Sequence, residues 1–459
     1  MKLALKRALK LLHLAVATLL LVVPAQAATE IMWWHAMSGE LGKQLEKLAA
    51  DFNASQSDYR IVPAYKGNYT ETVTAAIFAF RSRSQPAIVQ VNEIATATMM
   101  AARGAIYPVF ELMRDQSEVF APQAYLPAVA GYYADVDGNM LSFPFNASTP
   151  ILYYNKDMFR SAGLDPSQPP KTWAELGTMA KRLRAAGAMC GVTTSWPSWI
   201  NVENFSAFHN LPIATRSNGF AGLDAQLVFN NPIVVRHIAQ LAQWQTDKSF
   251  DYSGRGQAAE PRFQKGECGI FIGSSGTRAD IKANSKFEVG YGMMPYEADV
   301  QGAPQNSIIG GATLWVLRDR PRAEYAGVAK FFAYLSRPEV QAAWHQNTGY
   351  LPITRAAFDL TRTQASTIAI PALDLDRGGH AEAADRQVQG GPSRLVRAGP
   401  RRDRGGARTG VRRQALGTGR DGQRRRTRQP PAAPVRTRQS GPVMGASSAQ
   451  PLLRETANM

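Results

Sequence analysis

The side chains that could carry out catalysis are dispersed along the chain instead of being grouped in known motifs. The sequence contains no HExxH, no GxSxG and no GxxxxGK[ST], and no GxGxxG follows a predicted strand. The run at 273–276 (GSSG) is too short for a nucleophile turn, and the six histidines occur singly, without a partner at metal-ligand spacing. The pattern predicts no catalytic residue, no metal and no cofactor, and it argues against an enzyme.

Two polar residues lie where ligands of open α/β sheets bind. Apolar runs at 30–34, 60–65 and 87–91 predict strands, and the segments at 41–52 and 70–83 between them predict helices. This order predicts a parallel sheet with helices on both faces. Ligands of such sheets bind beyond the carboxyl ends of the strands, which makes Tyr69 and Glu93 candidate ligand contacts.

The remainder of the central region alternates strands and helices in the same way. We expect a strand at 151–154, helices at 173–186 and 232–247 flanking a strand that leads to Cys190, a helix at 325–335 and another beginning near Pro338. Roughly 430 residues follow the first 27, too many for one core, so two domains are expected.

The chain has only two cysteines, Cys190 and Cys268, and neither lies in a CxxC motif or near a histidine cluster. In an oxidising compartment they could form the single disulfide that two cysteines allow. They could equally remain buried free thiols. The sequence leaves both possibilities open.

The N-terminus has the pattern of a cleaved export signal. Four basic residues precede an apolar run of 13 residues at 11–23, and Pro24 and the small-x-small sequence at 25–27 follow. A membrane anchor is the alternative, but a spanning helix needs ~20 apolar residues. We expect residues 1–27 to be a signal peptide cleaved after Ala27, and the lack of a lipobox cysteine favours the periplasm.

The formal net charge of +16 does not describe the main body of the chain. Residues 366–459 contain 18 arginines, no lysine and seven acidic residues, whereas residues 28–365 contain 30 basic and 29 acidic residues. A basic surface for nucleic acid would therefore rest on the C-terminal tail alone. We expect no nucleic-acid partner.

Several longer runs carry a specific resemblance. The segments at 153–159 (YYNKDMF), 162–165 (AGLD) and 169–173 (PPKTW) resemble the extracellular solute-binding proteins of sugar ABC importers. Those at 34–42 (WHAMSGELG), 65–69 (YKGNY), 93–100 (EIATATMM) and 344–354 (WHQNTGYLPIT) resemble the branch of that family that binds sn-glycerol 3-phosphate. The similarity extends from about residue 28 to residue 364.

The resemblance implies an α/β, two-lobed periplasmic-binding-protein fold of the type II, or flytrap, kind, which closes on its ligand. By the family pattern, lobe one comprises residues 28–145 and 290–336. Lobe two comprises residues 146–289 and 337–364, and hinges lie near residues 145–150, 289–295 and 337. Residues 365–459 would form a tail outside both lobes.

The resemblance also implies a ligand site. The positions that match the family's ligand contacts are Tyr69, Glu93, Ser148, Ser274, Gly311 and Tyr350, with Trp196 and Trp199 as an aromatic wall. A carboxylate can accept hydrogen bonds from glycerol hydroxyls, the hydroxyl side chains can donate, and a glycine lets a backbone N–H approach phosphate. The aromatic wall suits glycerol carbons or a choline head group. Taken singly, each of these residue types is more often structural, as a core aromatic or a turn serine.

The tail does not continue the resemblance, because after Gln364 the chain becomes rich in Arg, Gly and Pro and lacks lysine. A disordered basic tail is one interpretation. The sharper hypothesis is a frameshift, since segments 365–371, 376–385 and 421–438, read one or two bases on, can encode sequences like the family's end, in family order. The chain would then lack the family's phosphate-binding arginine, and we expect weak phosphate binding or poor stability.

The leading hypothesis is a periplasmic binding subunit, which the resemblance implies is a monomer. It would deliver sn-glycerol 3-phosphate, or a glycerophosphodiester such as glycerophosphocholine, to membrane permease subunits with their ATPase. An oligosaccharide-binding protein of a related importer is the alternative, because the lobes are shared across sugar importers. A secreted phosphodiester hydrolase would need a metal or nucleophile cluster that the sequence lacks, and a nucleic-acid-binding arm would rest only on the tail.

Overall fold

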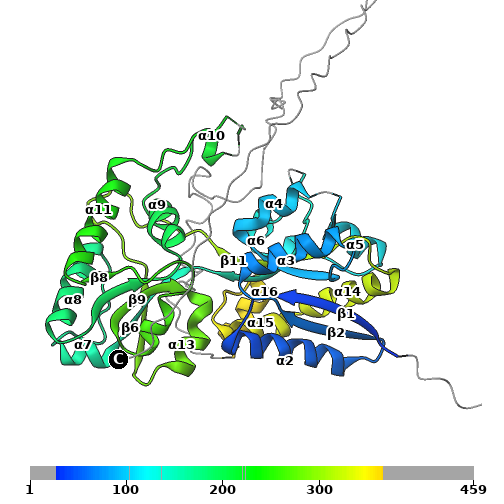
Figure 1. Ribbon diagram of the computed structural model, residues 1–459, viewed down its shortest axis with the longest axis horizontal. Coiled ribbons are helices and arrows are strands. Elements are labelled where there is room, and N and C mark those ends of the chain that lie inside the picture. The colour runs from blue at the N-terminus through cyan, green and yellow to red at the C-terminus, as the bar shows by residue number, and fades with distance from the viewer. Residues whose placement is uncertain (1–26, 103, 136, 220, 223, 365–459) are drawn as a thin grey trace, which may run out of the picture. The chain divides into compact units, whose positions relative to one another are not determined.

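The computed structural model describes residues 27–364, apart from residues 103, 136, 220 and 223. The predicted signal peptide, except Ala27, and the predicted tail at 365–459 lie outside the described residues, so the inferences about them stay predictions. Within the described part, the chain forms two sheets, each covered by helices (Figure 1).

The first sheet has six strands in the order β2, β1, β3, β11 and β4, with β5 paired to β11. Its strands are β1 (Thr29–His35), β2 (Tyr59–Tyr65), β3 (Ile88–Asn92), β4 (Ile106–Tyr107), β5 (Phe143–Ser148) and β11 (Gly310–Leu317). The three strands predicted first are present, and β1 pairs in parallel with β2 and β3. However, β11 is antiparallel to β3, β4 and β5, so the sheet is mixed and not fully parallel as predicted.

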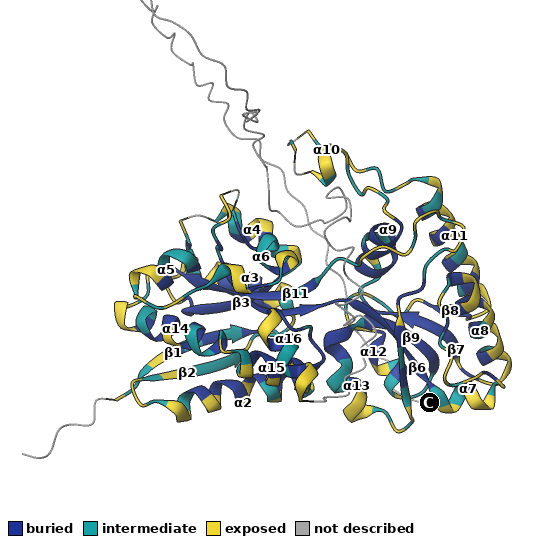
Figure 2. Cartoon of the chain, turned by 180° about the vertical axis from the view of Figure 1, so that it is seen from behind, coloured by how far each residue is buried: buried dark blue, intermediate teal, exposed yellow. Residues whose placement is uncertain are grey.

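Helices pack on both faces of this sheet. They are α2 (Gly39–Ser55), α3 (Tyr69–Arg81), α4 (Thr96–Ala101), α5 (Val109–Asp115), α6 (Pro127–Tyr132) and α14 (Arg322–Leu335), with a short 3-10 turn η2 (Pro122–Ala124). The predicted apolar stripe of α2 is buried, and Leu45 and Phe52 join the core that also contains Trp33 and Phe331. A smaller cluster around Val91 and Trp315 covers the opposite face. Figure 2 shows that these helices carry both buried residues (blue) and exposed residues (yellow).

The second sheet has five strands in the order β10, β6, β9, β7 and β8. They are β6 (Pro150–Asn155), β7 (Cys190–Thr194), β8 (Phe250–Asp251), β9 (Cys268–Ser274) and β10 (Val289–Met293). Its helices are α7 (Lys156–Ser161), α8 (Trp173–Ala185), α9 (Phe205–Phe208), α10 (Thr215–Asn218), α11 (Pro232–Thr246), α12 (Glu260–Gln264) and α13 (Arg278–Asn284), with the π-helix η3 (Trp199–Asn204) and the 3-10 turn η4 (Ser275–Thr277). Clusters centred on Trp173 and on Phe271 fill its two faces. The strand at 151–154 and the helices at 173–186 and 232–247 are confirmed.

Two last helices, α15 (Pro338–Thr348) and α16 (Arg355–Thr363), close the described chain, and the helix expected near Pro338 is confirmed. Trp344 of α15 and the following Tyr350 pack into the core of the first sheet. The strand β5 crosses the predicted boundary at residue 145, and β10 belongs to the second sheet. The division into lobes at the predicted residues stays a prediction.

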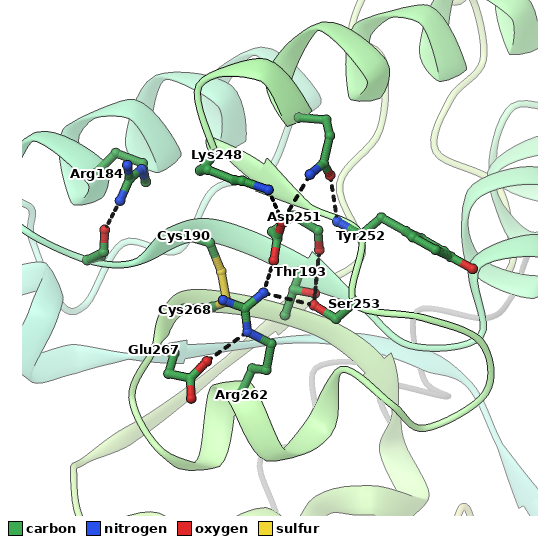
Figure 3. The surroundings of a disulfide bond; sticks show 12 residues. Arg184, Cys190, Thr193, Lys248, Asp251, Tyr252, Ser253, Arg262, Glu267 and Cys268 are labelled. Atoms are coloured by element: carbon green, nitrogen blue, oxygen red, sulfur yellow. Dashed lines mark hydrogen bonds and ion pairs between the residues drawn. A yellow bond between two sulfur atoms is a disulfide. The ribbon is translucent and has the colours of Figure 1, made fainter. Parts of the chain in front are cut away.

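Cys190 and Cys268 form a disulfide, which decides between the two possibilities that the sequence leaves open. The two residues are direct neighbours in the parallel pairing of β7 with β9, with their Cα atoms 4.6 Å apart. Figure 3 shows an ionic network beside the bridge, in which Arg262 pairs with Asp251 and with Glu267 (Nε to Oε2, 2.8 Å). Covalent and ionic links therefore join β9 and α12 to the neighbouring strands of the second sheet.

Candidate functional site

Glu93 is held at the carboxyl end of β3 by the adjacent strand. It begins the 3-10 turn η1 (Glu93–Ala95), and its Oε2 accepts a hydrogen bond from the backbone N–H of Gly311 at 3.1 Å. Gly311 has a φ of +125°, and a Cβ there would lie 2.1 Å from the backbone oxygen of Asn146, so only glycine fits. The predicted contacts Glu93 and Gly311 thus meet, but the Gly311 N–H donates to Glu93 and not toward a separate phosphate position.

Burial dominates the electrostatics of Glu93. It raises the pKa of the carboxyl to about 7, and the negative charge of Glu203 adds to the rise, while the backbone N–H groups of Glu93 and Gly311 oppose it. The residue is partly exposed, so the carboxyl is enclosed by protein atoms on most sides yet still reached by solvent. None of the groups that shift this pKa is a lysine or an arginine. The carboxylate therefore has acceptor capacity that the surrounding protein meets only in part.

Tyr69 and Tyr350 lie together close to Glu93. Tyr69 is the first residue of α3, whose start is fixed by a capping box in which Asn68 Oδ1 accepts from the Glu71 N–H at 3.0 Å and the Asn68 N–H donates to Glu71 Oε2 at 2.7 Å. Burial and Glu93 raise the pKa of Tyr69, and the side chain of Tyr350 partly offsets this. Burial also raises the pKa of Tyr350, with which the Tyr69 hydroxyl interacts, so both tyrosines stay neutral.

Tyr350 is fixed by aromatic and glycine contacts. Its ring is parallel to that of Trp344, with centroids 6.1 Å apart. A Cβ on Gly276 would lie 2.5 Å from the Tyr350 ring, so this glycine allows the segment after β9 to approach the ring. Since Ser274 Oγ accepts from the Gly276 N–H at 3.1 Å, the predicted contacts Ser274 and Tyr350 belong to the same part of the site.

Ser148 and Ser274 flank the place where the chain crosses from the first sheet to the second. Ser148 ends β5 opposite Gly310 of β11, and two residues later Pro150 pairs with Ser274 of β9. Thr149, between them, accepts a hydrogen bond at its oxygen from the Ser275 N–H at 2.9 Å. Ser148 is almost fully buried and Ser274 is partly exposed.

The two tryptophans lie on the second-sheet side. Trp199 is 6% exposed and its Nε1 has no hydrogen-bond partner among the described residues. The edge of its ring faces Gly310, where a Cβ would lie 2.8 Å from Cζ2 and 3.1 Å from Cε2. Trp196 has a φ of +46°, which is rare for a bulky residue, and its N–H donates to the Gly256 oxygen at 2.8 Å. Such a strained backbone at a partly exposed aromatic residue is typical of functional sites.

The structure therefore joins the predicted contacts in two linked groups. The group around the end of β3 consists of Tyr69, Glu93, Gly311 and Tyr350. The group around the crossing segment consists of Ser148, Ser274 and Trp199. The glycine pair at 310–311 connects the two groups. Trp196 packs with the core of the second sheet, and no contact places it on Glu93. Glu203 and Tyr132, which share electrostatic interactions with Glu93, were not among the predicted contacts.

Two openings in the described part of the chain lie away from Glu93. One cavity lies inside the first core and is lined by residues including Phe143, Leu335 and Trp344. A shallow depression of ≈ 360 Å³ is lined by the outer side of η3, α11 and Tyr252. Neither is lined by Glu93. Among the described residues, no group of three or more His, Cys, Asp or Glu side chains could hold a metal ion. No helix in this part of the chain is long and apolar enough to cross a bilayer.

Comparison with known proteins identifies the family. The sequence pattern of the bacterial extracellular solute-binding proteins matches residues 47–372. The chain is 52% identical over 359 residues to the sn-glycerol-3-phosphate-binding periplasmic protein UgpB of Yersinia pestis, covering 78% of this chain and 82% of that protein. It is also 52% identical over 352 residues to UgpB of Salmonella typhimurium, covering 76% and 80%.

Solved structures of the same architecture agree with the arrangement of the two sheets. UgpB from Mycobacterium tuberculosis, crystallised with glycerophosphocholine, superposes with a TM-score of 0.63 at 21% identity over 77% of this chain and 87% of that one. The acarbose receptor GacH of Streptomyces glaucescens gives a TM-score of 0.63 at 18% identity over 76% and 87%. The fold is the two-lobed periplasmic-binding-protein fold, as the sequence predicted, and binding proteins of this kind are not enzymes. The chain belongs to the family of bacterial extracellular solute-binding proteins.

Proposed function

We propose that this chain is the periplasmic subunit of an ABC importer that captures sn-glycerol 3-phosphate and related glycerophosphodiesters such as glycerophosphocholine. The observation that carries the proposal is the Glu93 carboxylate, which is fixed by the Gly311 N–H beside the hydroxyl groups of Tyr69 and Tyr350. A fixed, incompletely satisfied carboxylate flanked by neutral hydroxyl donors suits the vicinal hydroxyls of glycerol. The identity of 52% with UgpB supports this choice of ligand.

The remaining parts of the proposed function follow from the family. The chain would be exported, act as a monomer in the periplasm and hand its ligand to two permease subunits with their ATPase. Ser148, Ser274 and the tryptophans would contact the phosphate side or the head group of the ligand. The described residues bring no lysine or arginine to Glu93, so we expect the charge partner of the phosphate to come from elsewhere, as in the frameshift hypothesis.

The test is calorimetric titration of two versions of the protein with sn-glycerol 3-phosphate, glycerophosphocholine and maltotriose. One version has its own tail, and in the other the reading frame after Gln364 is restored. We expect the restored version to bind the two glycerol phosphates, more tightly than the first version by about 1.5–3 kcal/mol because it regains a charge-assisted contact.

Two variants give the matched comparison. Glu93→Gln should weaken binding of both glycerol phosphates, whereas Glu339→Gln, which removes the same charge from an exposed position on α15, should leave binding unchanged. If neither version binds a glycerol phosphate and maltotriose binds instead, the oligosaccharide alternative replaces the proposal. Equal binding by both versions would refute the role assigned to the missing C-terminal arginine.

A further inference from the structure

Glu203 lies in the π-helix η3, which packs beside the second sheet. Two contacts of η3 fix its position relative to the site. Asn204 Oδ1, at the end of η3, accepts a hydrogen bond from the Ile308 N–H at 3.0 Å. Trp199, at the start of η3, lies with its ring edge against Gly310. Both anchors therefore hold η3 against the start of β11. The second residue of that strand, Gly311, donates its N–H to Glu93.

The helical spacing places Glu203 on the same side as Trp199. The two residues are four apart, and residues four apart share a face of an α-helix and, because a π-helix turns only slightly wider, of a π-helix as well. The face of η3 that carries Trp199 is the face against Gly310. Glu203 therefore points toward the end of β3, and it is partly exposed there.

The electrostatic interactions agree with this placement. Burial raises the pKa of Glu93 and that of Tyr132, the last residue of α6. The charge of Glu203 adds to the rise at Glu93, and the charges of both carboxylates add to the rise at Tyr132. The pKa of Glu203 is itself raised by burial. The two carboxylates and the Tyr132 hydroxyl are therefore close enough to interact, and neither carboxylate has an ion pair with a described residue.

A second, independent feature indicates that a ligand occupies this space. The Nε1–H of Trp199, which belongs to the ring edge beside Gly310, is buried and has no acceptor among the described residues. Because a buried donor without an acceptor is unfavourable, an oxygen of the ligand is the natural partner. Oxygen atoms of the glycerol phosphate would satisfy Trp199, and a positive group on the same ligand would relieve the repulsion between the carboxylates.

We propose that Glu203 is a specificity-determining residue that pairs with the cationic head group of a glycerophosphodiester, while Glu93 binds the glycerol hydroxyls. The proposal rests on the proposed function. A phosphate monoester carries about −1.5 to −2 charges near neutral pH and is repelled by a second carboxylate. A diester with a choline or ethanolamine group carries one negative and one positive charge, so it places a cation where Glu203 and Tyr132 can receive it. Glu203 therefore raises the affinity for the diester relative to the monoester.

The test is calorimetric titration of the full chain and of Glu203→Gln, Glu203→Lys and Glu339→Gln with glycerophosphocholine and sn-glycerol 3-phosphate. We expect Glu203→Gln to weaken binding of glycerophosphocholine about 10-fold and to leave or improve binding of the monoester. Glu203→Lys should improve binding of the monoester further, a gain that a folding defect cannot produce. Glu339→Gln should change neither affinity.

The outcomes separate this inference from the proposed function. If neither the unaltered chain nor the version with the restored reading frame binds a glycerol phosphate, the proposed function fails and takes the inference with it. If either version binds both ligands, and Glu203→Gln in that version weakens both by the same factor or neither, Glu203 has a structural role or none, and the inference is wrong. A lower ratio of diester to monoester affinity in both Glu203 variants, with an unchanged ratio in Glu339→Gln, supports it.

Discussion

Glu93→Gln should stabilise the ligand-free protein at alkaline pH while removing its binding activity. The folded-state pKa of Glu93 is about 7, against an ordinary value of 4.5, because the ionised carboxyl is buried beside Glu203. Each pKa unit corresponds to ~1.4 kcal/mol, so ionisation of this group destabilises the fold by at most ~3.5 kcal/mol at pH 8. Since the side chain is partly exposed, solvent screening reduces this, and we expect ~1–2 kcal/mol.

The sign of the pH dependence follows from the direction of the shift. Above pH 7 the carboxyl is ionised in both the folded and the unfolded state, and the folded state carries the full penalty. Between pH 7 and 4.5 the folded state binds more protons than the unfolded state, so the penalty falls as the pH falls, and below 4.5 it is absent. Glutamine is neutral throughout and can still accept the Gly311 N–H, so the stabilisation should be present at pH 8 and disappear by pH 4.

The assay is urea unfolding of the unaltered protein and of Glu93→Gln at pH 8 and pH 4, without ligand. Glu260 also has a raised pKa of about 7, but it contributes equally to both proteins and cancels in the difference. Glu339→Gln controls for the loss of one negative charge from the surface. A variant that is less stable at pH 8, or a stability difference that is the same at both pH values, would show that burial does not raise the pKa of Glu93.

Three further substitutions test other parts of the structure. Gly311→Ala should destabilise the fold by ~2–4 kcal/mol and weaken ligand binding, because its Cβ would meet the backbone of Asn146 at a φ of +125°. Thermal melting followed by circular dichroism measures the stability, and calorimetric titration measures the binding. An unchanged melting temperature would contradict the geometry. Replacement of Cys190 and Cys268 by serine should lower the free energy of unfolding by ~2–4 kcal/mol, measured in urea, and reductant should then have no further effect. His237 is buried, and neither of its ring nitrogens has a hydrogen-bond partner among the described residues. Burial lowers its pKa to about 3, so the stability that the neutral ring allows above pH 6.5 is lost as the pH falls toward 3. His237→Phe should therefore be more stable than the unaltered protein by ~2 kcal/mol at pH 4.5, and unfolding in urea across acid pH should show a smaller loss of stability.

Local patterns predicted much of the fold, because periodicity and capping act over short distances. The apolar stripe of α2 and the strands β1, β2 and β3 lie where the alternation of apolar residues placed them. The positions of Tyr69 and Glu93 followed from strand ends in the same way, and the structure brings both to one edge of the first sheet.

Contacts between distant parts of the chain could not be read from such patterns. The Gly311 N–H that fixes Glu93 comes from a residue 218 positions later, through a strand that is antiparallel where a parallel sheet was predicted. The disulfide depends on the register between β7 and β9, which two isolated cysteines do not reveal. Glu203 is the single acidic residue of η3, and only its spacing of four from Trp199 could have indicated the role proposed for it.

The adjacent glycines Gly310 and Gly311 explain why both halves of the site meet at one short segment. Gly310 has no side chain to exclude Trp199 from the second-sheet side, and Gly311 adopts a backbone conformation that aims its N–H at Glu93 on the first-sheet side. A side chain at position 310 would displace Trp199, and a side chain at position 311 would displace the N–H that binds Glu93. Gly310→Ala should therefore perturb the aromatic and head-group side, whereas Gly311→Ala should perturb the hydroxyl-binding side. In the proposed function, this segment would couple the Glu93 carboxylate that binds glycerol to the helix that carries Glu203. Selectivity between monoester and diester would then depend on how rigidly these two glycines hold the two parts together.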